Sequence, residues 1–138
     1  MKITSRQNQV RVGVGCWIFN SNGQILLGKR RSEHGNGTWA PPGGKLEFAE
    51  TLQQCASREL FEETGIIIPQ NKFSILSFTN DIFPQQHYIT IHCCAKNVIA
   101  TPIIKEPDKC EQWKWFDLDK LPKPLFLSAS NLLKQKIL

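Results

Sequence analysis

The stretch that decides the fold runs from residue 44 to residue 66 and reads Gly-Lys-Leu-Glu-Phe-Ala-Glu-Thr-Leu-Gln-Gln-Cys-Ala-Ser-Arg-Glu-Leu-Phe-Glu-Glu-Thr-Gly-Ile. From about Glu50 to Thr64 it contains no Gly or Pro and is rich in good helix formers. Gly65 then suits the left-handed position that ends many helices. The sequence therefore predicts one helix here, entered from a tight Gly-rich loop.

Three glutamates gather on one side of this predicted helix. Glu59, Glu62 and Glu63 stand three and four residues apart, close to the side that carries the apolar residues. Like charges at this spacing cost roughly 0.2 to 0.5 kcal/mol per pair, and burying them unpaired costs far more. Arg58 or a hard divalent cation is expected to supply the positive charge. The alternative is that the glutamates are simply solvated on a surface helix.

The pattern of residue types and spacings along this stretch is more specific than the helix geometry. The stretch resembles the complete Nudix box of the MutT-type hydrolases at every specified position, which here are Gly44, Glu50, Arg58, Glu59, Leu60, Glu62, Glu63, Gly65 and Ile66. The resemblance implies a loop-helix-loop that binds Mg2+ or Mn2+. It also implies hydrolysis of a nucleoside diphosphate linked to another group.

The resemblance implies a role for each matching residue. Glu59 and Glu63 would be the principal metal ligands, Glu62 a ligand or a carboxylate behind the ligands, and Gly44 a backbone ligand. Glu50 would add a further carboxylate to the metal cluster. Its alternative explanation is a place in the first helical turn, where the helix dipole favours an anion.

The catalytic set implied by the resemblance is Glu59, Arg58 and Glu62. Arg58 would orient Glu59 by a charge-assisted hydrogen bond. Glu59 is the first candidate for the general base that takes a proton from the attacking water. Glu111 is the alternative base, and its other explanation is a surface ion pair with a lysine.

The order of the expected elements indicates a fold of mixed class. Strands are expected at about 10–19, 24–29, 73–79, 87–96 and 111–116, with an extended piece at 45–48 and a closing helix at 128–137. So many apolar positions require cover on both faces of the sheet. Together with the resemblance, this predicts an α/β Nudix-type α/β/α sandwich with a mixed sheet between helices, formed by residues 1–138 as one domain. Residues 1–9 are expected to form a loose arm or an edge.

Bulk properties narrow the class of protein. Hydrophobic residues make up 41% and charged residues 21% of the chain, and no apolar stretch is long enough to span a bilayer. The five cysteines form no Cys-x-x-Cys pair, so a zinc site or a disulfide framework is not expected. A cytoplasmic protein is the default expectation, with no membrane partner.

The net charge of +5 favours anionic partners. A small nucleotide is expected rather than a nucleic acid polymer, because no basic run interleaved with aromatic residues is present. Lys29 and Arg30 end a predicted strand and are candidate phosphate contacts together with Glu111 as a substrate-binding residue. The alternative is that these strand-end cations are solvated.

Three segments, one of which overlaps the start of the box, suggest the substrate class. Residues 42–50, 87–91 and 111–115 resemble the nucleoside triphosphate diphosphatase branch of the family, which releases a monophosphate and pyrophosphate. A nucleotide-sugar or ADP-ribose pyrophosphatase is the second hypothesis, and a nucleotide sensor without turnover is the third. Trp39, Phe83 or Tyr88 could stack on a base, but a place in the core is the favoured expectation for each. The resemblance also suggests a homodimer.

Overall fold

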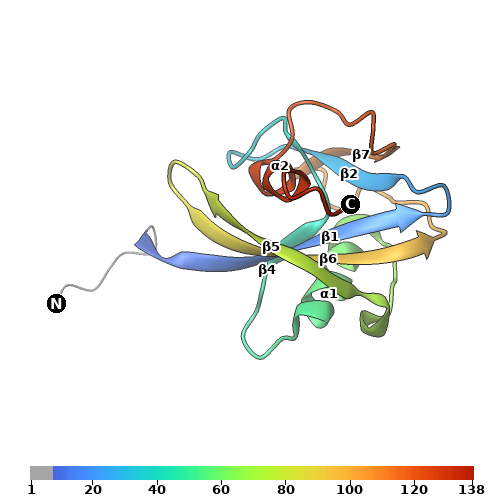
Figure 1. The fold of residues 1–138 in the computed structure, drawn as a ribbon, viewed down its shortest axis with the longest axis horizontal. Helices are drawn as coiled ribbons and strands as arrows, with labels where there is room; N and C mark the ends of the chain where they lie inside the picture. Colours follow the sequence, from blue (N-terminus) through green and yellow to red (C-terminus); the bar gives the residue numbers. More distant parts are fainter. Residues whose placement is uncertain (1–7) are drawn as a thin grey trace.

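The computed structural model describes residues 8–138, so the predicted loose arm at 1–9 falls almost entirely outside the described part. A long ladder forms the centre of the fold (Figure 1). Strand β1 (Val10–Asn20) pairs in parallel with β6 (His87–Val98), and β6 pairs antiparallel with β5 (Ser74–Ile82). Parallel and antiparallel neighbours therefore share one mixed sheet.

The remaining strands join this ladder at β1. Strand β2 (Ile25–Arg30) pairs with β1 at one position, with β3 (Trp39–Ala40) on one side and with β7 (Cys110–Phe116) on the other. The short strand β4 (Gly43–Lys45) pairs with the middle of β1. The described sheet has seven strands in the order β3-β2-β1-β6-β5, with β4 and β7 off this path.

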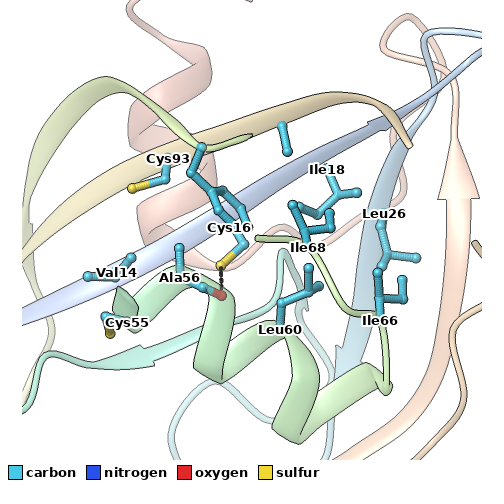
Figure 2. Close-up of a cluster of buried hydrophobic side chains, with 12 residues drawn as sticks. Val14, Cys16, Ile18, Leu26, Cys55, Ala56, Leu60, Ile66, Ile68 and Cys93 are labelled. Atoms are coloured by element: carbon cyan, nitrogen blue, oxygen red, sulfur yellow. Dashed lines mark hydrogen bonds between the residues drawn. The ribbon is translucent and has the colours of Figure 1, made fainter. Parts of the chain in front are cut away.

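Two helices cover opposite faces of the sheet, because successive strand residues point to opposite sides. Cys16 and Ile18 of β1 pack with Leu60 of α1 (Leu52–Thr64) in one buried cluster (Figure 2). Trp17, between them in sequence, packs with Leu132 of α2 (Leu127–Leu133) in the other cluster. The predicted α/β/α sandwich with a mixed sheet is confirmed.

Local signals set the bounds of α1. Thr51 is the N-cap and accepts a hydrogen bond from the Gln54 backbone, while the Gln54 side chain returns one to Thr51. Gly65 ends the helix with a φ of 76°. Glu50 consequently lies before the N-cap, and the interpretation that it occupies the first helical turn is wrong.

Two other predicted bounds also differ. Strand β5 continues to Ile82 rather than ending at residue 79, because hydrogen bonding to β6 extends almost to the turn. Helix α2 ends at Leu133, and Lys136 adopts a left-handed φ of 56° that is incompatible with a helix to residue 137. Between residues 8 and 138 no helix is both long and apolar enough to cross a bilayer.

Candidate active site

The side of α1 that carries Glu59 and Glu63 faces the two glycines of β4. The Glu63 carboxylate accepts a hydrogen bond of 2.7 Å from the Gly43 N–H. A Cβ atom built on Gly44 would overlap the Glu59 carboxylate. Glycine at position 44 therefore leaves room for the Glu59 carboxylate, whereas a Cβ on Gly43 would meet the backbone of Val14 on β1. Gly44 itself lies inside the strand, in register with Val14 of β1, rather than in the open loop predicted from sequence.

Arg58 organises the neighbouring carboxylates. Its Nε and one terminal nitrogen donate to Glu50 at 2.6 and 2.9 Å, which is a bidentate fork. Its other terminal nitrogen donates to Glu59 at 2.7 Å. These hydrogen bonds lower the pKa of Glu50 to about 2. The hydrogen bond to Glu50 is the largest cause that raises the pKa of Arg58, and the hydrogen bond to Glu59 adds to it.

Glu62 lies at the rim of this arrangement. Its side chain is 47% exposed and approaches Arg58 at 3.3 Å, and Glu47 approaches Arg58 at 3.7 Å from the preceding loop. Arg58 is thus the positive partner that the helix spacing required for Glu59 and Glu62. Across residues 8–138, no three acidic, His or Cys side chains converge as a ready metal cage. Glu59, Glu62 and Glu63 do not meet at one point in this arrangement.

Among residues 8–138, Glu63 forms no ion pair of this kind, and the chemistry of its carboxylate fits a metal ligand. Burial raises the pKa of Glu63 to about 8, and the charges of Glu59 and Glu106 raise it further against the Gly43 hydrogen bond. Burial also raises the pKa of Glu59, although Arg58 opposes the shift. The fold therefore disfavours two adjacent anions that a hard divalent cation would stabilise. The donor set of carboxylate and backbone oxygens suits Mg2+ or Mn2+.

Glu106 is a carboxylate whose charge acts on the site and which the sequence reasoning missed, and its side chain lies 3.7 Å from the Lys109 ammonium. It lies in the segment between β6 and β7, where no periodic pattern indicates which side chains turn inward. Its charge acts on both Glu59 and Glu63. Glu111, the residue chosen from sequence, lies on β7, where its side chain is 4.0 Å from the Lys29 ammonium and 44% exposed. The lysine pair that was the alternative explanation of Glu111 is therefore present.

Arg30 holds the segment that follows β2. It donates to the His34 carbonyl at 2.9 Å and to the Ser32 hydroxyl, and its guanidinium lies 4.5 Å from the centre of the Phe126 ring. Burial lowers the pKa of Arg30, and the charge of Glu63 opposes that shift. Arg30 is therefore within electrostatic reach of the carboxylates, whereas Lys29 pairs with Glu111.

Aromatic rings gather next to Arg30. His34 lies 4.2 Å from Phe83 and 5.3 Å from Phe126, measured between ring centres, and Tyr88 lies 6.4 Å from Phe83. We call His34, Phe83, Tyr88 and Phe126 the aromatic cluster. Trp39 is not a member: it packs against Phe116 in the core beneath α2. Two of the three rings considered from sequence as stacking partners are therefore together, and the third is in the core.

Known proteins resemble this chain in sequence over most of its length. The family described as "NUDIX domain" matches residues 9–135. An oxidized purine nucleoside triphosphate hydrolase of Danio rerio is 33% identical over 102 residues, 72% of this chain and 62% of the relative. An ADP-ribose pyrophosphatase of Methanocaldococcus jannaschii is 34% identical over 109 residues, 79% of this chain and 63% of the relative.

A solved structure gives the likeness in three dimensions. The crystal structure of a MutT NUDIX hydrolase from Burkholderia pseudomallei has a TM-score of 0.83 and 32% identity, covering 95% of this chain and 99% of that one. The two relatives above extend beyond the match, since this chain spans only 62% and 63% of their lengths. Their names differ in substrate at nearly equal identity.

Proposed function

From the premise that this chain belongs to the NUDIX family, we propose that it hydrolyses the pyrophosphate linkage of nucleotides with the help of Mg2+ or Mn2+. The observation that carries the proposal is the pair of carboxylates on Gly43 and Gly44. Glu59 and Glu63 both have raised pKa values and both lie against this backbone. Gly44 leaves room for the Glu59 carboxylate and the Gly43 N–H holds Glu63, so two disfavoured anions lie where a cation would stabilise them.

The proposed metal residues are Glu59 and Glu63, with Glu62, Glu50 and the Gly44 backbone in supporting places. A bound divalent cation would neutralise phosphate oxygens and acidify a water. Glu62 reaches this role by a side-chain rotation, since its carboxylate is exposed and only loosely paired. Glu50 is fully engaged by Arg58, so its contribution is to fix the guanidinium.

Arg58 acts as a positioning residue in this proposal. By donating to Glu59 it fixes one carboxylate oxygen and leaves the other directed to the reaction. Glu59 then takes the proton of the attacking water as general base. Glu106 is the second candidate for this base, because its charge raises the pKa of both Glu59 and Glu63, and on that electrostatic ground we propose it in place of Glu111.

A nucleoside triphosphate, cleaved to a monophosphate and pyrophosphate, is the proposed substrate. The aromatic cluster offers faces on which a base could stack. Arg30, beside the aromatic cluster and within reach of Glu63, is placed to attract phosphate oxygens between them. Lys29 and Glu111 would line the outer edge of the same site. A small nucleotide fits this description better than a polymer.

The second candidate is a nucleotide-sugar or ADP-ribose pyrophosphatase, which the similarity to the archaeal ADP-ribose pyrophosphatase favours. A nucleotide sensor without turnover is the third. The complete set of Glu59, Glu62 and Glu63 weighs against the sensor, because binding alone does not require all three. We further propose one hydrolase domain over residues 1–138 and a cytoplasmic location, the latter because all five cysteines are free.

A substrate panel tests these proposals. The purified protein is incubated with nucleoside triphosphates, oxidised purine triphosphates, ADP-ribose and nucleotide-sugars, each with Mg2+, with Mn2+ and with chelator. Release of pyrophosphate from triphosphates only with a divalent cation is the expected result. Release of a sugar phosphate instead would support the second candidate. Tight binding of a nucleotide with no product in any arm would contradict hydrolysis.

A further inference from the structure

A groove lies between two segments of chain beyond the end of α1. Residues 65–69 line one side of it, and residues 95–101, from the end of β6 into the segment that follows, line the other. The two segments are joined where the Ile103 N–H donates to the Thr64 carbonyl at 2.9 Å. Within residues 8–138, no backbone hydrogen bond joins the two sides of the groove themselves. Its volume of about 540 Å3 is within the range of pockets that hold ligands.

The groove has a buried apolar floor and exposed isoleucines on both sides. Ile66, Ile68 and Ala95 are 4%, 6% and 3% exposed and belong to the cluster under α1 (Figure 2). Ile67 is 78% exposed on one side of the groove, and Ile99 is 91% exposed on the other. Apolar surface is therefore available on both sides of whatever enters the groove.

The β6 side of the groove contains a free strand edge. β5 pairs with β6 only as far as Ser74 and Cys94, whereas β6 continues to Val98. Among the strands that the structure describes, none adjoins residues 95–98 on the β5 side. Such an edge presents backbone N–H and C=O groups with which an extended peptide can pair as an added strand. An acyl chain offers no groups for this pairing.

The charge of the groove is positive. Lys72 and Lys96 are the ionisable members of its described lining, and both are exposed. Lys105 lies next to it, because its Cδ is 3.7 Å from the place of a Cβ on Gly65, and its ammonium is 4.0 Å from the centre of the Phe61 ring. A lysine on a strand edge opposes pairing with an apolar strand. A strand that carries carboxylates would instead complement these lysines.

The groove is far from the start of β1. Val10 pairs with His87 at that start, whereas Asn20 pairs with Val98 in the groove. Ten residues at about 3.3 Å each place these two rows about 33 Å apart. Seven residues extend over at most about 25 Å, so residues 1–7 are too short to fill the groove from that end. They also include no acidic residue. The occupant that the groove fits therefore comes from another molecule.

We propose that the groove binds an acidic, extended segment of a partner protein, which adds a strand to the free edge of β6. The backbone of this segment pairs with residues 95–98. Its aliphatic side chains lie between Ile67 and Ile99, and its carboxylates meet Lys72 and Lys96. The free edge favours a peptide over a membrane surface, which would use the isoleucines and lysines but leave the edge unpaired. The proposal does not depend on hydrolysis.

Titration of the 15N-labelled full chain with two synthetic peptides tests this groove. The probe is Glu-Val-Glu-Val-Glu-Val, and Lys-Val-Lys-Val-Lys-Val is the control with the opposite charge. We expect saturable shifts of the amide resonances of residues 66–68 and 95–101 with the acidic peptide alone. Hydrogen exchange at the groove-facing amides of residues 95–98 should slow at the same time, because pairing with an added strand protects them.

A charge reversal tests the role of the lysines. Lys96→Glu should raise the dissociation constant of the acidic peptide at least tenfold and should allow the basic peptide to bind. Lys120→Glu makes the same change at an exposed position outside the groove and should keep the affinity of the parent. Because both lysine side chains are exposed, the variants should fold, which circular dichroism and thermal melting check.

An isoleucine substitution tests the apolar part of the groove. Ile99→Ser should raise the same dissociation constant severalfold, whereas Ile137→Ser, at a position that is 47% exposed and outside the groove, should not. Absence of shifts in the groove up to about 1 mM acidic peptide overturns the proposal. Equal affinity in Lys96→Glu and the parent does so as well. Binding to phosphatidylserine vesicles without any peptide binding would assign the surface to a membrane and also overturn the proposal.

Discussion

At the scale of single residues, Arg58 determines how the acidic side chains share their space. It forms a bidentate fork with Glu50 and a third hydrogen bond with Glu59, while Glu62 and Glu47 approach it at longer range. Glu63 is left with a backbone N–H as its partner. Glu59 is therefore held by a guanidinium, whereas Glu63 is a carboxylate that a cation would stabilise.

Replacing Glu59 with Gln should lower turnover by about 10²-fold or more, because the variant loses both a metal ligand and the proposed base. The fold should persist, since the amide oxygen still accepts from Arg58. The measurement is kcat with saturating Mg2+, beside a thermal melt of the same sample. Glu33→Gln makes the same chemical change at an exposed position and should keep the parent rate. Parent turnover in Glu59→Gln would contradict the assigned role.

Glu106 and Glu111 can be separated by the same kind of substitution. Glu106→Gln should reduce kcat about 10²-fold and alter its pH profile, because the charge at residue 106 acts on Glu59 and Glu63. Glu111→Gln should change kcat little, because that residue pairs with Lys29 on β7. A larger loss of kcat in Glu111→Gln would return the role of second base to the residue chosen from sequence.

At the scale of elements, α1 functions as a rigid support whose two ends are set by different devices. The capping box of Thr51 and Gln54 satisfies donors at its start, and Gly65 takes the left-handed conformation at its end. The strand β4 is the opposing element: Gly44 leaves room for Glu59 of the helix, and Gly43 leaves room for the backbone of β1. Carboxylates placed on a helix and a strand are held more firmly than carboxylates on loops.

Removing the cap should therefore destabilise the whole fold through α1. Thr51→Ala should lower the free energy of unfolding by about 1 kcal/mol, because one orphan N–H loses its acceptor. The check is the urea midpoint at a fixed m-value. Thr51→Ser keeps a hydroxyl in the same place and should stay within a few tenths of a kcal/mol of the parent. Equal losses in both variants would show that the methyl group, and not the cap, is responsible.

At the scale of the whole molecule, a buried polar chain links the layers. Trp17 of β1 donates to the His92 ring on β6 at 2.8 Å, and the other ring nitrogen meets the Thr79 hydroxyl of β5 at 2.9 Å. Thr79 donates to Asp81, whose carboxylate also accepts from Asn131 of α2 at 2.9 Å. His92 and Asp81 are both fully buried. Such a network fixes the position of α2 on the sheet.

This network predicts a pH dependence of stability. Burial lowers the pKa of His92 to about 4, although the charge of Asp81 opposes the shift. In the unfolded chain His92 has an ordinary pKa near 6.5. Between about pH 6.5 and pH 4 it is therefore protonated in the unfolded chain but neutral in the folded protein. The contribution of neutral His92 to the free energy of unfolding is therefore fully present above pH 6.5. It decreases as the pH falls through this window, by up to about 3 kcal/mol at pH 4.

Urea titrations between pH 4 and pH 7.5 measure this dependence. His92→Gln removes the titrating group and keeps an amide that can serve both neighbours, so its free energy of unfolding should fall less steeply below pH 6.5 than that of the parent. His87→Gln is the control, because that ring is at the exposed end of β6. Parallel slopes for the parent and His92→Gln would contradict the shifted pKa.

Local patterns predicted the parts of this protein that depend on nearest neighbours. The spacing of residues 50–66 predicted α1, its end at Gly65 and the side shared by Glu59 and Glu63, because helix period and capping act within a few residues. Alternating apolar residues predicted β1 and β6, and the box predicted the family. The start of α1 was misplaced by two residues, since the signal at Thr51 competes with an acidic residue just before it.

The sequence by itself thus determined the elements, the family and the acidic helix face. Only the tertiary structure decided that Arg58 pairs first with Glu50, that Glu63 lies on Gly43, and that the charge of Glu106 acts on both Glu59 and Glu63. The physical reason is that desolvation and pairing depend on which distant segments pack together. The periodicity of residue types along the chain does not indicate which distant segments come into contact.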